Sequence, residues 1–151
     1  MTIQVVPFLR MHIAPIAADL RDGDWMELRA MGYKTPLHAV RACANNHPHS
    51  VAALDAGLPI AAWGYRPDDL LLSDTAYLWC VTTNAVKAHK KEILRLSRGF
   101  VDRLQMQYGR LESTVSPIYP QAMRWVEWLG FKPFSEETRN GVRFINIVRE
   151  R

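Results

Sequence analysis

The sequence lacks any long apolar run, repeated segment or low-complexity tract. A membrane span needs about 20 consecutive apolar residues, and no run of that length occurs among the 151 residues. The early apolar stretch is interrupted by Pro7 and Arg10, which does not fit a signal peptide. We therefore expect a protein without a membrane span that is made in a cytoplasm and is either kept there or packaged from it.

Cysteine is scarce as well, with only Cys43 and Cys80 in the chain. The two residues lie far apart in apolar surroundings, so two buried thiols are favoured over a disulfide or a reactive site. No cysteine or histidine pair has metal-ligand spacing, and no metal site is expected. His38, His47 and His49 are interpreted as loop histidines, with metal binding as the minor alternative.

Charge is distributed unevenly along the chain. The net charge is +4, but the stretch 87–110 holds seven basic side chains against Glu92 and Asp102, so the remaining residues sum to −1. Hydrophobic residues make up 48% of the chain and charged residues 23%, which is typical of a folded domain and excludes disorder. One domain over residues 1–151 is expected, with its positive charge concentrated on a single helix.

Hydrophobic periodicity and turn residues predict an alternation of strands and helices. Thr35 before Pro36 is a helix start, and Asp24 with Glu27 has the spacing of a capping box, with Asp24 as the N-cap. The predicted elements are a strand over 2–9, helices over 13–20, 24–32 and 36–43, a hairpin over 50–65, a strand over 75–83, a helix over 87–108, a strand over 111–115, a helix over 122–129 and a hairpin over 134–148.

The most informative stretch is 122–131, an amphipathic helix followed by Leu129-Gly130-Phe131. Gly130 suits a left-handed helix end, and Phe131 is expected to fold back onto the last turn. Asn140-Gly141 then favours the tight turn of a terminal hairpin. Together these signals predict a helix that leads directly into the last strand pair of a sheet.

This element order, with the Leu-Gly-Phe exit and the small-residue hairpin over 51–62, resembles the GNAT acyltransferase fold. The resemblance covers essentially the whole chain. It implies a single α/β domain with a mixed, twisted sheet of about seven strands and helices on both faces. It also implies, as the family's chemistry, a loop that holds the pyrophosphate of acetyl-CoA, a general acid and a general base.

Two of these three devices are missing from the matching positions. The stretch 82–91 contains no glycine, so its backbone is less able to close around a pyrophosphate. The position of the acid is occupied by Val126, which has no proton to donate. If the protein is active, the resemblance leaves Glu112 as base and Tyr119 as stand-in acid, with Asp74 a weaker base candidate. If acetyl-CoA binds, the candidate contacts are Val81, Thr83, Lys87, Ala88 and His89.

A narrower resemblance is to GNAT-like internal virion proteins of short-tailed phages, carried by the aromatic strand over 77–83, the basic helix over 87–103 and the stretch 124–131. It implies a non-catalytic virion or assembly protein without a cofactor, made in the host cytoplasm and then packaged. Its partners would be other virion or assembly proteins or copies of itself. The candidate contact residues are Lys90, Lys91, Arg98 and Trp128.

Two alternatives stand beside that interpretation. The first is an acetyl-CoA-dependent N-acetyltransferase with an atypical pyrophosphate loop. The second is a nucleic-acid-binding module that uses the basic helix 87–108. Nucleic acid is the less favoured partner, because no aromatic residues alternate with the basic ones to form a stacking platform.

Overall fold

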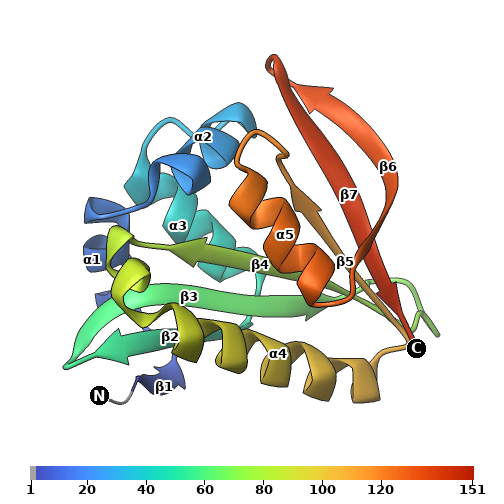
Figure 1. The fold of residues 1–151 in the computed structure, drawn as a ribbon, viewed down its shortest axis with the longest axis horizontal. Coiled ribbons are helices and arrows are strands. Elements are labelled where there is room, and N and C mark those ends of the chain that lie inside the picture. Colours follow the sequence, from blue (N-terminus) through green and yellow to red (C-terminus); the bar gives the residue numbers. More distant parts are fainter. Residues whose placement is uncertain (1–2) are drawn as a thin grey trace.

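Seven strands form one mixed, twisted sheet in the computed structural model, which describes residues 3–151 (Figure 1). The strands run in the order β1-β2-β3-β4-β5-β7-β6. Only β4 and β5 are parallel neighbours, since every other pairing is antiparallel. The strands are β1 (Gln4–Pro7), β2 (His49–Asp55), β3 (Leu58–Pro67), β4 (Thr75–Thr82), β5 (Arg110–Val115), β6 (Lys132–Arg139) and β7 (Val142–Glu150). The predicted α/β fold with about seven strands is confirmed.

Helices cover both faces of this sheet. On one face α4 and α5 pack side by side over β4, β5 and β7, in a core that includes Ala76, Val101 and Ile147. On the other face α1 and α3 pack over β3 and β4, around Ile16, Val40 and Val81. The helices are α1 (Ile13–Ala18), α2 (Asp22–Ala30), α3 (Pro36–Asn46), α4 (Lys90–Gln107) and α5 (Pro120–Trp128), with the 3₁₀ helices η1 (Arg10–His12) and η2 (Asn84–His89).

Several local predictions are confirmed. Thr35 caps α3 by accepting the His38 N–H at 3.1 Å, as a threonine before a first-turn proline should. Gly130 has a φ of +95° after α5, and Phe131 is buried against the core. Asn140 and Gly141 both have positive φ between β6 and β7, which is the backbone that the type I′ turn of a hairpin requires.

Other predictions need correction. Helix α2 begins at Asp22 with Arg21 as its N-cap, so Asp24 lies inside the helix and does not cap it. The long helix is interrupted, because 84–89 winds as the 3₁₀ helix η2 before α4 begins. Thr2, where the first strand was expected to begin, lies outside the described residues. Within residues 3–151 no helix is both long and apolar enough to cross a membrane.

Gly64 sits where β2 and β3 come into close contact. A Cβ at this position would stand 2.5 Å from the His49 carbonyl oxygen and 2.7 Å from Ser50 Cα, and backbone atoms cannot move aside cheaply. Replacing Gly64 with alanine is therefore expected to destabilise the fold by roughly 1–3 kcal/mol, measured by urea unfolding. Gly99→Ala is the matched control. Its Cβ would meet only the flexible end of Arg103 at 3.1 Å, and alanine favours the α4 helix. Equal losses in both variants would contradict the steric explanation.

Candidate active site

The β4–β5 pairing ends after a few residues, and the two strands then separate. The parallel register covers only Thr75–Tyr77 against Arg110–Glu112. Just beyond it, the Ser113 hydroxyl donates to the Leu78 carbonyl at 3.1 Å and bridges the start of the gap. The strands continue apart toward Thr82 and Val115, so an opening forms in the middle of the sheet. We refer to this opening as the split.

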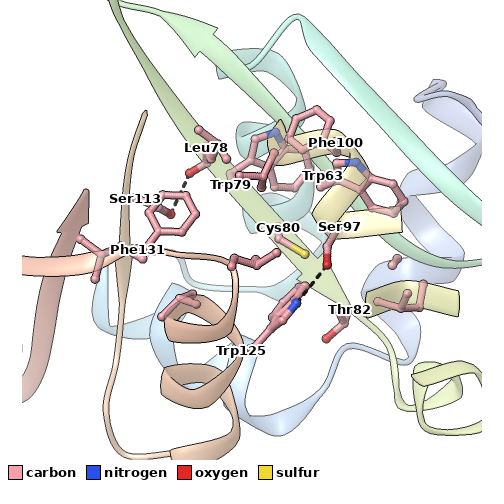
Figure 2. A pocket seen from close by; sticks show the side chains of 16 residues that line it. Trp63, Leu78, Trp79, Cys80, Thr82, Ser97, Phe100, Ser113, Trp125 and Phe131 are labelled. Carbon is pink, nitrogen blue, oxygen red and sulfur yellow. Dashed lines mark hydrogen bonds between the residues drawn. The ribbon is translucent and has the colours of Figure 1, made fainter. Parts of the chain in front are cut away.

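A mostly apolar cavity of about 100 Å³ lies on the helical side of the split, between α4, α5 and the sheet (Figure 2). Its walls include Trp63, Phe100 and Val126. The Trp125 indole N–H donates to Ser97 Oγ at 3.1 Å, and this bond joins α5 to α4. We call this space the α4–α5 cavity. We call the Trp125–Ser97 bond, whose two residues both line the cavity, the Trp125–Ser97 bridge.

A larger cleft of about 1180 Å³ lies on the opposite face, between α2, α3 and the β6–β7 hairpin. Aromatic residues and carboxylates line it, among them Trp79, Phe134 and Glu27. The Asn140 amide donates to the Ala30 carbonyl at 2.7 Å, so the hairpin tip is attached to the end of α2. We call this space the α2–β7 cleft. It is wide enough for a whole small molecule, for which pockets of roughly 300–1,000 Å³ are usual.

The two spaces meet at the split. Both are lined by Leu78, Trp79, Cys80 and Ser113. In a strand, alternate residues point their backbone groups to the same side. The Leu78 carbonyl points toward Ser113 and the Thr82 N–H toward α2, so the Cys80 N–H between them is directed into the split. A ligand entering from one face can therefore reach a ligand on the other face beside a backbone donor.

Two carboxylates of α2 hold the far ends of the separated strands. Asp24 accepts hydrogen bonds from the Thr82 N–H at 2.7 Å and from its hydroxyl at 2.6 Å, at the end of β4. Glu27, one helical turn later, accepts the Ser116 N–H at 2.9 Å, just after β5. Residues three apart on a helix share a face, which is why one helix can reach both strands. The pair lines the α2–β7 cleft next to the split.

Burial makes both carboxylates unusually basic. It raises the pKa of Glu27 to about 7, and the neighbouring charge of Asp24 acts in the same direction. Burial also raises the pKa of Asp24 above its ordinary value, although the Thr82 hydrogen bonds and Arg21 oppose the shift. A carboxylate that titrates near neutral pH can accept a proton from a substrate, which an ordinary surface glutamate does poorly. Glu27 is therefore a candidate general base.

Cys80 is not the buried core thiol that the sequence predicted. Its side chain is accessible because the separation of β4 from β5 leaves it facing the hollow of the split (Figure 2). Surrounding protein atoms nevertheless raise the pKa of its thiol strongly, mainly through burial and further through the charge of Asp24.

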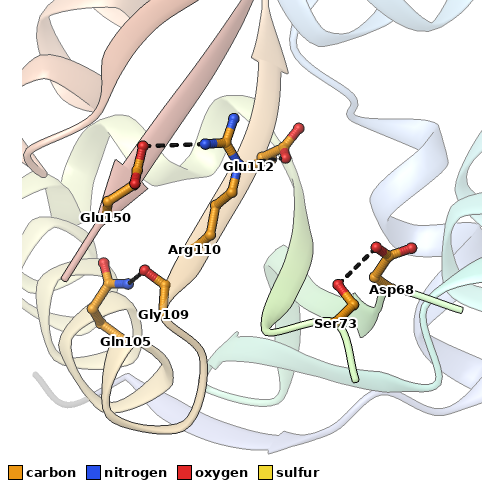
Figure 3. Close-up of polar contacts among 7 residues, drawn as sticks. All are labelled: Asp68, Ser73, Gln105, Gly109, Arg110, Glu112 and Glu150. Atoms are coloured by element: carbon orange, nitrogen blue, oxygen red, sulfur yellow. Dashed lines mark hydrogen bonds and ion pairs between the residues drawn. The ribbon is translucent and has the colours of Figure 1, made fainter. Parts of the chain in front are cut away.

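The predicted base Glu112 does line the α2–β7 cleft, but it is already paired. Arg110 Nε donates to its carboxylate at 2.8 Å, and Arg110 also contacts Glu150 at 3.1 Å (Figure 3). Asp74 lies elsewhere, in an ion pair of 3.0 Å with Arg151 near the chain terminus. The Glu112 carboxylate is thus already engaged by a cation, whereas Glu27 accepts the backbone N–H of Ser116. The catalytic role of Glu112 stays a prediction, and Glu27 is the stronger candidate.

Tyr119, the predicted stand-in acid, precedes α5 and packs against α2. A Cβ on Gly23 would lie 3.0 Å from the Tyr119 ring, so the ring rests on the backbone of the α2 start. Tyr119 is not among the residues that line the α4–α5 cavity or the α2–β7 cleft. The position expected from the resemblance for an acid, Val126, does line the cavity. Tyr119 would need to move to reach the split, and its role stays a prediction.

The residues predicted to contact a cofactor differ in how far they are already engaged in contacts within the protein. Val81 and Thr83 are buried, and Thr83 donates both its N–H and its hydroxyl to the Ile60 carbonyl. His89 is held by Asp55 at 2.9 Å and lies 4.0 Å from Glu92. Only Lys87 and Ala88 are exposed. The segment before α4 therefore offers surface charge, but several of its polar groups already serve the fold.

The predicted partner-binding residues lie on or beside α4. Lys90 and Lys91 are exposed in its first turn. Arg98 donates to the Trp128 carbonyl and stacks over the Trp128 ring, 4.1 Å from its centroid, so these two candidates form a second link between α4 and α5. Trp128 remains 49% exposed. Their role in partner binding stays a prediction.

Sequence reasoning missed the two α2 carboxylates as site residues. Asp24 and Glu27 were assigned to a capping box, whereas the structure directs them to Thr82 and Ser116. The signal that was present is their three-residue spacing, which fits two carboxylates on one helix face as well as a capping box. Only the long-range contact between α2 and the strand ends decides between the two interpretations.

No protein-family model matches the chain, and no curated protein matches it in sequence. Solved structures match its fold over nearly the whole length. A GNAT-family acetyltransferase from Bacillus anthracis has a TM-score of 0.69 at 10% identity, covering 98% of this chain and 94% of that one. The ribosomal-protein-S18-alanine N-acetyltransferase from Escherichia coli has a TM-score of 0.70 at 13% identity, covering 99% and 94%.

A third structure, the spermidine N-acetyltransferase from Vibrio cholerae in complex with CoA and spermine, has a TM-score of 0.70 at 13% identity, covering 98% of this chain and 95% of that one. At these identities the likeness establishes the fold, so this chain has the GNAT fold, as predicted. The main functional interpretation from the sequence, a non-catalytic phage virion or assembly protein, is wrong. The similar structures are acetyltransferases, and they favour the enzyme alternative.

Proposed function

We propose that the protein is an N-acyltransferase that moves an acyl group from a pantetheine thioester, such as acetyl-CoA, to an amine. The observation that carries this proposal is the meeting of the α4–α5 cavity and the α2–β7 cleft at the split, with Glu27 beside it. Such an arrangement lets donor and acceptor approach from opposite faces of the sheet. The structural neighbours include acetyltransferases with coenzyme A bound, which supports the same reading.

The residues that line the α4–α5 cavity fit the thioester arm of coenzyme A, whereas the segment before α4 fits its diphosphate poorly. The α4–α5 cavity is apolar and ends at the directed Cys80 N–H, which suits a thioester and the arm that carries it. At about 100 Å³ the cavity admits only the end of that arm while the Trp125–Ser97 bridge is closed. The segment 84–89 is a 3₁₀ helix without glycine, and it does not present an open backbone loop to a diphosphate.

Within this proposal the residues have distinct roles. Coenzyme A supplies an acyl group activated as a thioester, whose carbonyl is attacked by the amine. The Cys80 N–H donates to the carbonyl oxygen and stabilises the negative charge that develops there. The Glu27 carboxylate takes the proton that the amine loses as its nitrogen forms the new C–N bond. The C–S bond breaks, and Asp24 keeps the end of β4 in place throughout.

No side chain that lines the α4–α5 cavity is a suitable acid for the departing sulfur, and the raised pKa of the Cys80 thiol makes it a weaker acid than an ordinary thiol. Val126 has no proton to give, and the Ser97 and Ser113 hydroxyls already donate to the Leu94 and Leu78 carbonyls, at 2.8 and 3.1 Å. A thiol has an ordinary pKa of roughly 8.5, so its thiolate is a tolerable leaving group near neutral pH. The sulfur therefore takes its proton from solvent.

The proposal is tested by incubating the purified protein with millimolar acetyl-CoA and a panel of amines. The panel contains a polyamine, an aminoglycoside and peptides with free α-amino groups. Amide formation is followed by mass spectrometry, because a thiol reagent would also report the accessible Cys80. Acetylated product that requires the protein and disappears in Glu27→Gln supports the proposal. Absence of product from every amine and every pantetheine thioester overturns it.

Trp125→Phe is expected to strengthen donor binding by roughly threefold to tenfold, because a smaller ring replaces the indole that bridges α5 to α4 in the cavity wall and leaves more room for the donor. The lost hydrogen bond to Ser97 should cost about 1 kcal/mol of stability. Donor affinity is measured by calorimetric titration with acetyl-CoA. Ser97→Ala is the matched control, since it breaks the same bond and keeps the indole. Weaker donor binding in Trp125→Phe than in the parent protein would contradict the gating role of this bridge.

A further inference from the structure

The segment 83–89, just before α4, uses several of its polar groups in hydrogen bonds within the protein, which leaves fewer of them to bind a nucleotide. The Thr83 N–H donates to the Ile60 carbonyl at 2.9 Å, and the Asn84 N–H donates to the Asp19 carbonyl at 3.1 Å. The Asn84 amide adds a 3.0 Å bond to the Asp19 carboxylate. His89 is tied to Asp55. This segment therefore lacks the open run of backbone donors that would select the diphosphate of free coenzyme A.

Positive charge instead covers the exposed side of α4, next to the place where α4 meets α5. We define the basic face by the exposed or half-exposed cations of α4 and the turn before it, which are Lys87, Lys90, Lys91, Arg95 and Arg98, with Arg124 of α5. The Ser97 and Arg98 contacts fix which side of α4 faces α5, and Ser97 also lines the cavity. By helical spacing, Lys90, Lys91 and Leu94 lie on that same side.

Among residues 3–151 no ion pair neutralises a cation of this face, and the exposed carboxylate of Glu127 on α5 stands against its six cations. Glu92 turns inward, where it accepts the Ile3 N–H at 3.0 Å and approaches His89. Asp102 is paired with Arg149 at 2.7 Å. Cations in the first turn of a helix are also disfavoured by the helix dipole. The first-turn lysines therefore raise the free energy of the isolated protein, and an acidic partner would offset that cost.

Apolar side chains are set among these cations. Leu94 is 37% exposed, and Trp128 is 49% exposed with Arg98 stacked on its ring. Aromatic and arginine side chains together are typical of protein-binding hot spots. A small phosphate ligand would gain nothing from Leu94. The combination of surface charge with exposed apolar contacts fits a folded protein of negative charge.

We propose that the natural donor is a thioester on the 4′-phosphopantetheine arm of an acidic carrier protein, which docks on the basic face and threads its arm into the α4–α5 cavity. This inference rests on the proposed acyl transfer. The arm is the same group that coenzyme A carries, so the chemistry at the split is unchanged. The amine nitrogen bonds to the acyl carbon, the C–S bond breaks, Glu27 takes the amine proton, and the arm leaves as a thiol protonated by solvent. The affinity that a diphosphate cradle would provide comes instead from protein–protein contact.

The docking step is tested with a fluorescently labelled acyl carrier protein loaded with an acetyl-phosphopantetheine arm. Binding to the full-length protein is measured by anisotropy at low and high ionic strength. Lys90→Glu combined with Lys91→Glu is expected to weaken binding by roughly tenfold or more, and salt should weaken it as well. The matched control is Arg10→Glu combined with Arg41→Glu. It reverses two exposed charges outside both spaces, and its binding should stay within about twofold of the parent.

Activity measurements distinguish failure of the carrier-protein inference from failure of the proposed acyl transfer. The acetylated carrier protein should give a kcat/KM at least about tenfold above that of acetyl-CoA with the same amine, and the Lys90/Lys91 reversal should remove that advantage. Acetylpantetheine, which lacks the carrier and the nucleotide, should be used equally by parent and variant. Transfer from acetyl-CoA without any carrier binding or advantage overturns this inference and leaves the proposed function standing. Carrier binding without transfer from any thioester overturns the proposed function.

Discussion

Replacing Glu27 with glutamine should lower kcat by roughly 10²- to 10⁴-fold, the usual contribution of a general base. Glutamine has nearly the same shape and its side-chain oxygen can still accept the Ser116 N–H, so the contact between α2 and β5 is kept. The variant loses only the ability to take a proton. Donor binding should therefore change little, because the proposed donor site, the α4–α5 cavity, lies on the other face of the sheet.

Steady-state kinetics with the best amine from the screen measure this effect. The parent kcat/KM should rise with pH through about 7, because Glu27 acts in its ionised form and its pKa is about 7. No descending limb from a protein acid is expected, since Val126 occupies the acid position. Glu136→Gln, which alters an exposed ion pair with Arg143, is the control for a lost carboxylate.

Glu112→Gln is the competing test. Glu112 lines the same α2–β7 cleft and was the base that the sequence favoured. If Glu112→Gln loses activity with the same pH dependence while Glu27→Gln keeps it, the assignment of the base moves to Glu112. If both lose activity and only Glu27→Gln also loses the rise near pH 7, Glu112 acts by orienting the acceptor.

The fold was predictable because its decisive signals are local. Thr35 with Pro36, Gly130 with Phe131, and Asn140 with Gly141 each act through a few neighbouring residues. The strand order follows once the strand pairs and connections are known. The long helix was harder, because the contacts of Asn84 and His89 with distant residues hold 84–89 as a 3₁₀ helix.

The site was less predictable because its geometry depends on contacts between segments distant in sequence. Glu27 and Ser116 are 89 residues apart, and Asp24 and Thr82 are 58 apart. A pattern within one turn of helix cannot show that these carboxylates turn away from their own backbone. The exposure of Cys80 likewise follows from the separation of β4 and β5, which no local pattern encodes. The absence of glycine from segment 82–91 and the valine at the acid position, Val126, therefore suggested a lost reaction. The carboxylates that support the proposed reaction, Asp24 and Glu27, were assigned to helix capping.

The same Glu27→Gln variant should be more stable than the parent at pH 8, by as much as about 3 kcal/mol. The folded pKa of about 7 lies above the ordinary value of 4.5, so the folded protein prefers the protonated carboxyl. The penalty for ionising Glu27 in place is absent below pH 4.5, grows as pH rises toward 7 and is complete above it. A neutral glutamine avoids that penalty at every pH.

Thermal unfolding at pH 5 and pH 8 measures this difference. The melting temperature of Glu27→Gln should exceed that of the parent by roughly 5–10 °C at pH 8 and by much less at pH 5. Glu112→Gln is the control, because it removes the negative charge that pairs with Arg110 and should give no gain at pH 8. A glutamine variant that is less stable than the parent at pH 8 would mean that the charge on Glu27 is well solvated in the fold. A gain in stability together with a loss of activity would show a carboxylate that the fold holds at a thermodynamic cost, as expected for a group retained for proton transfer.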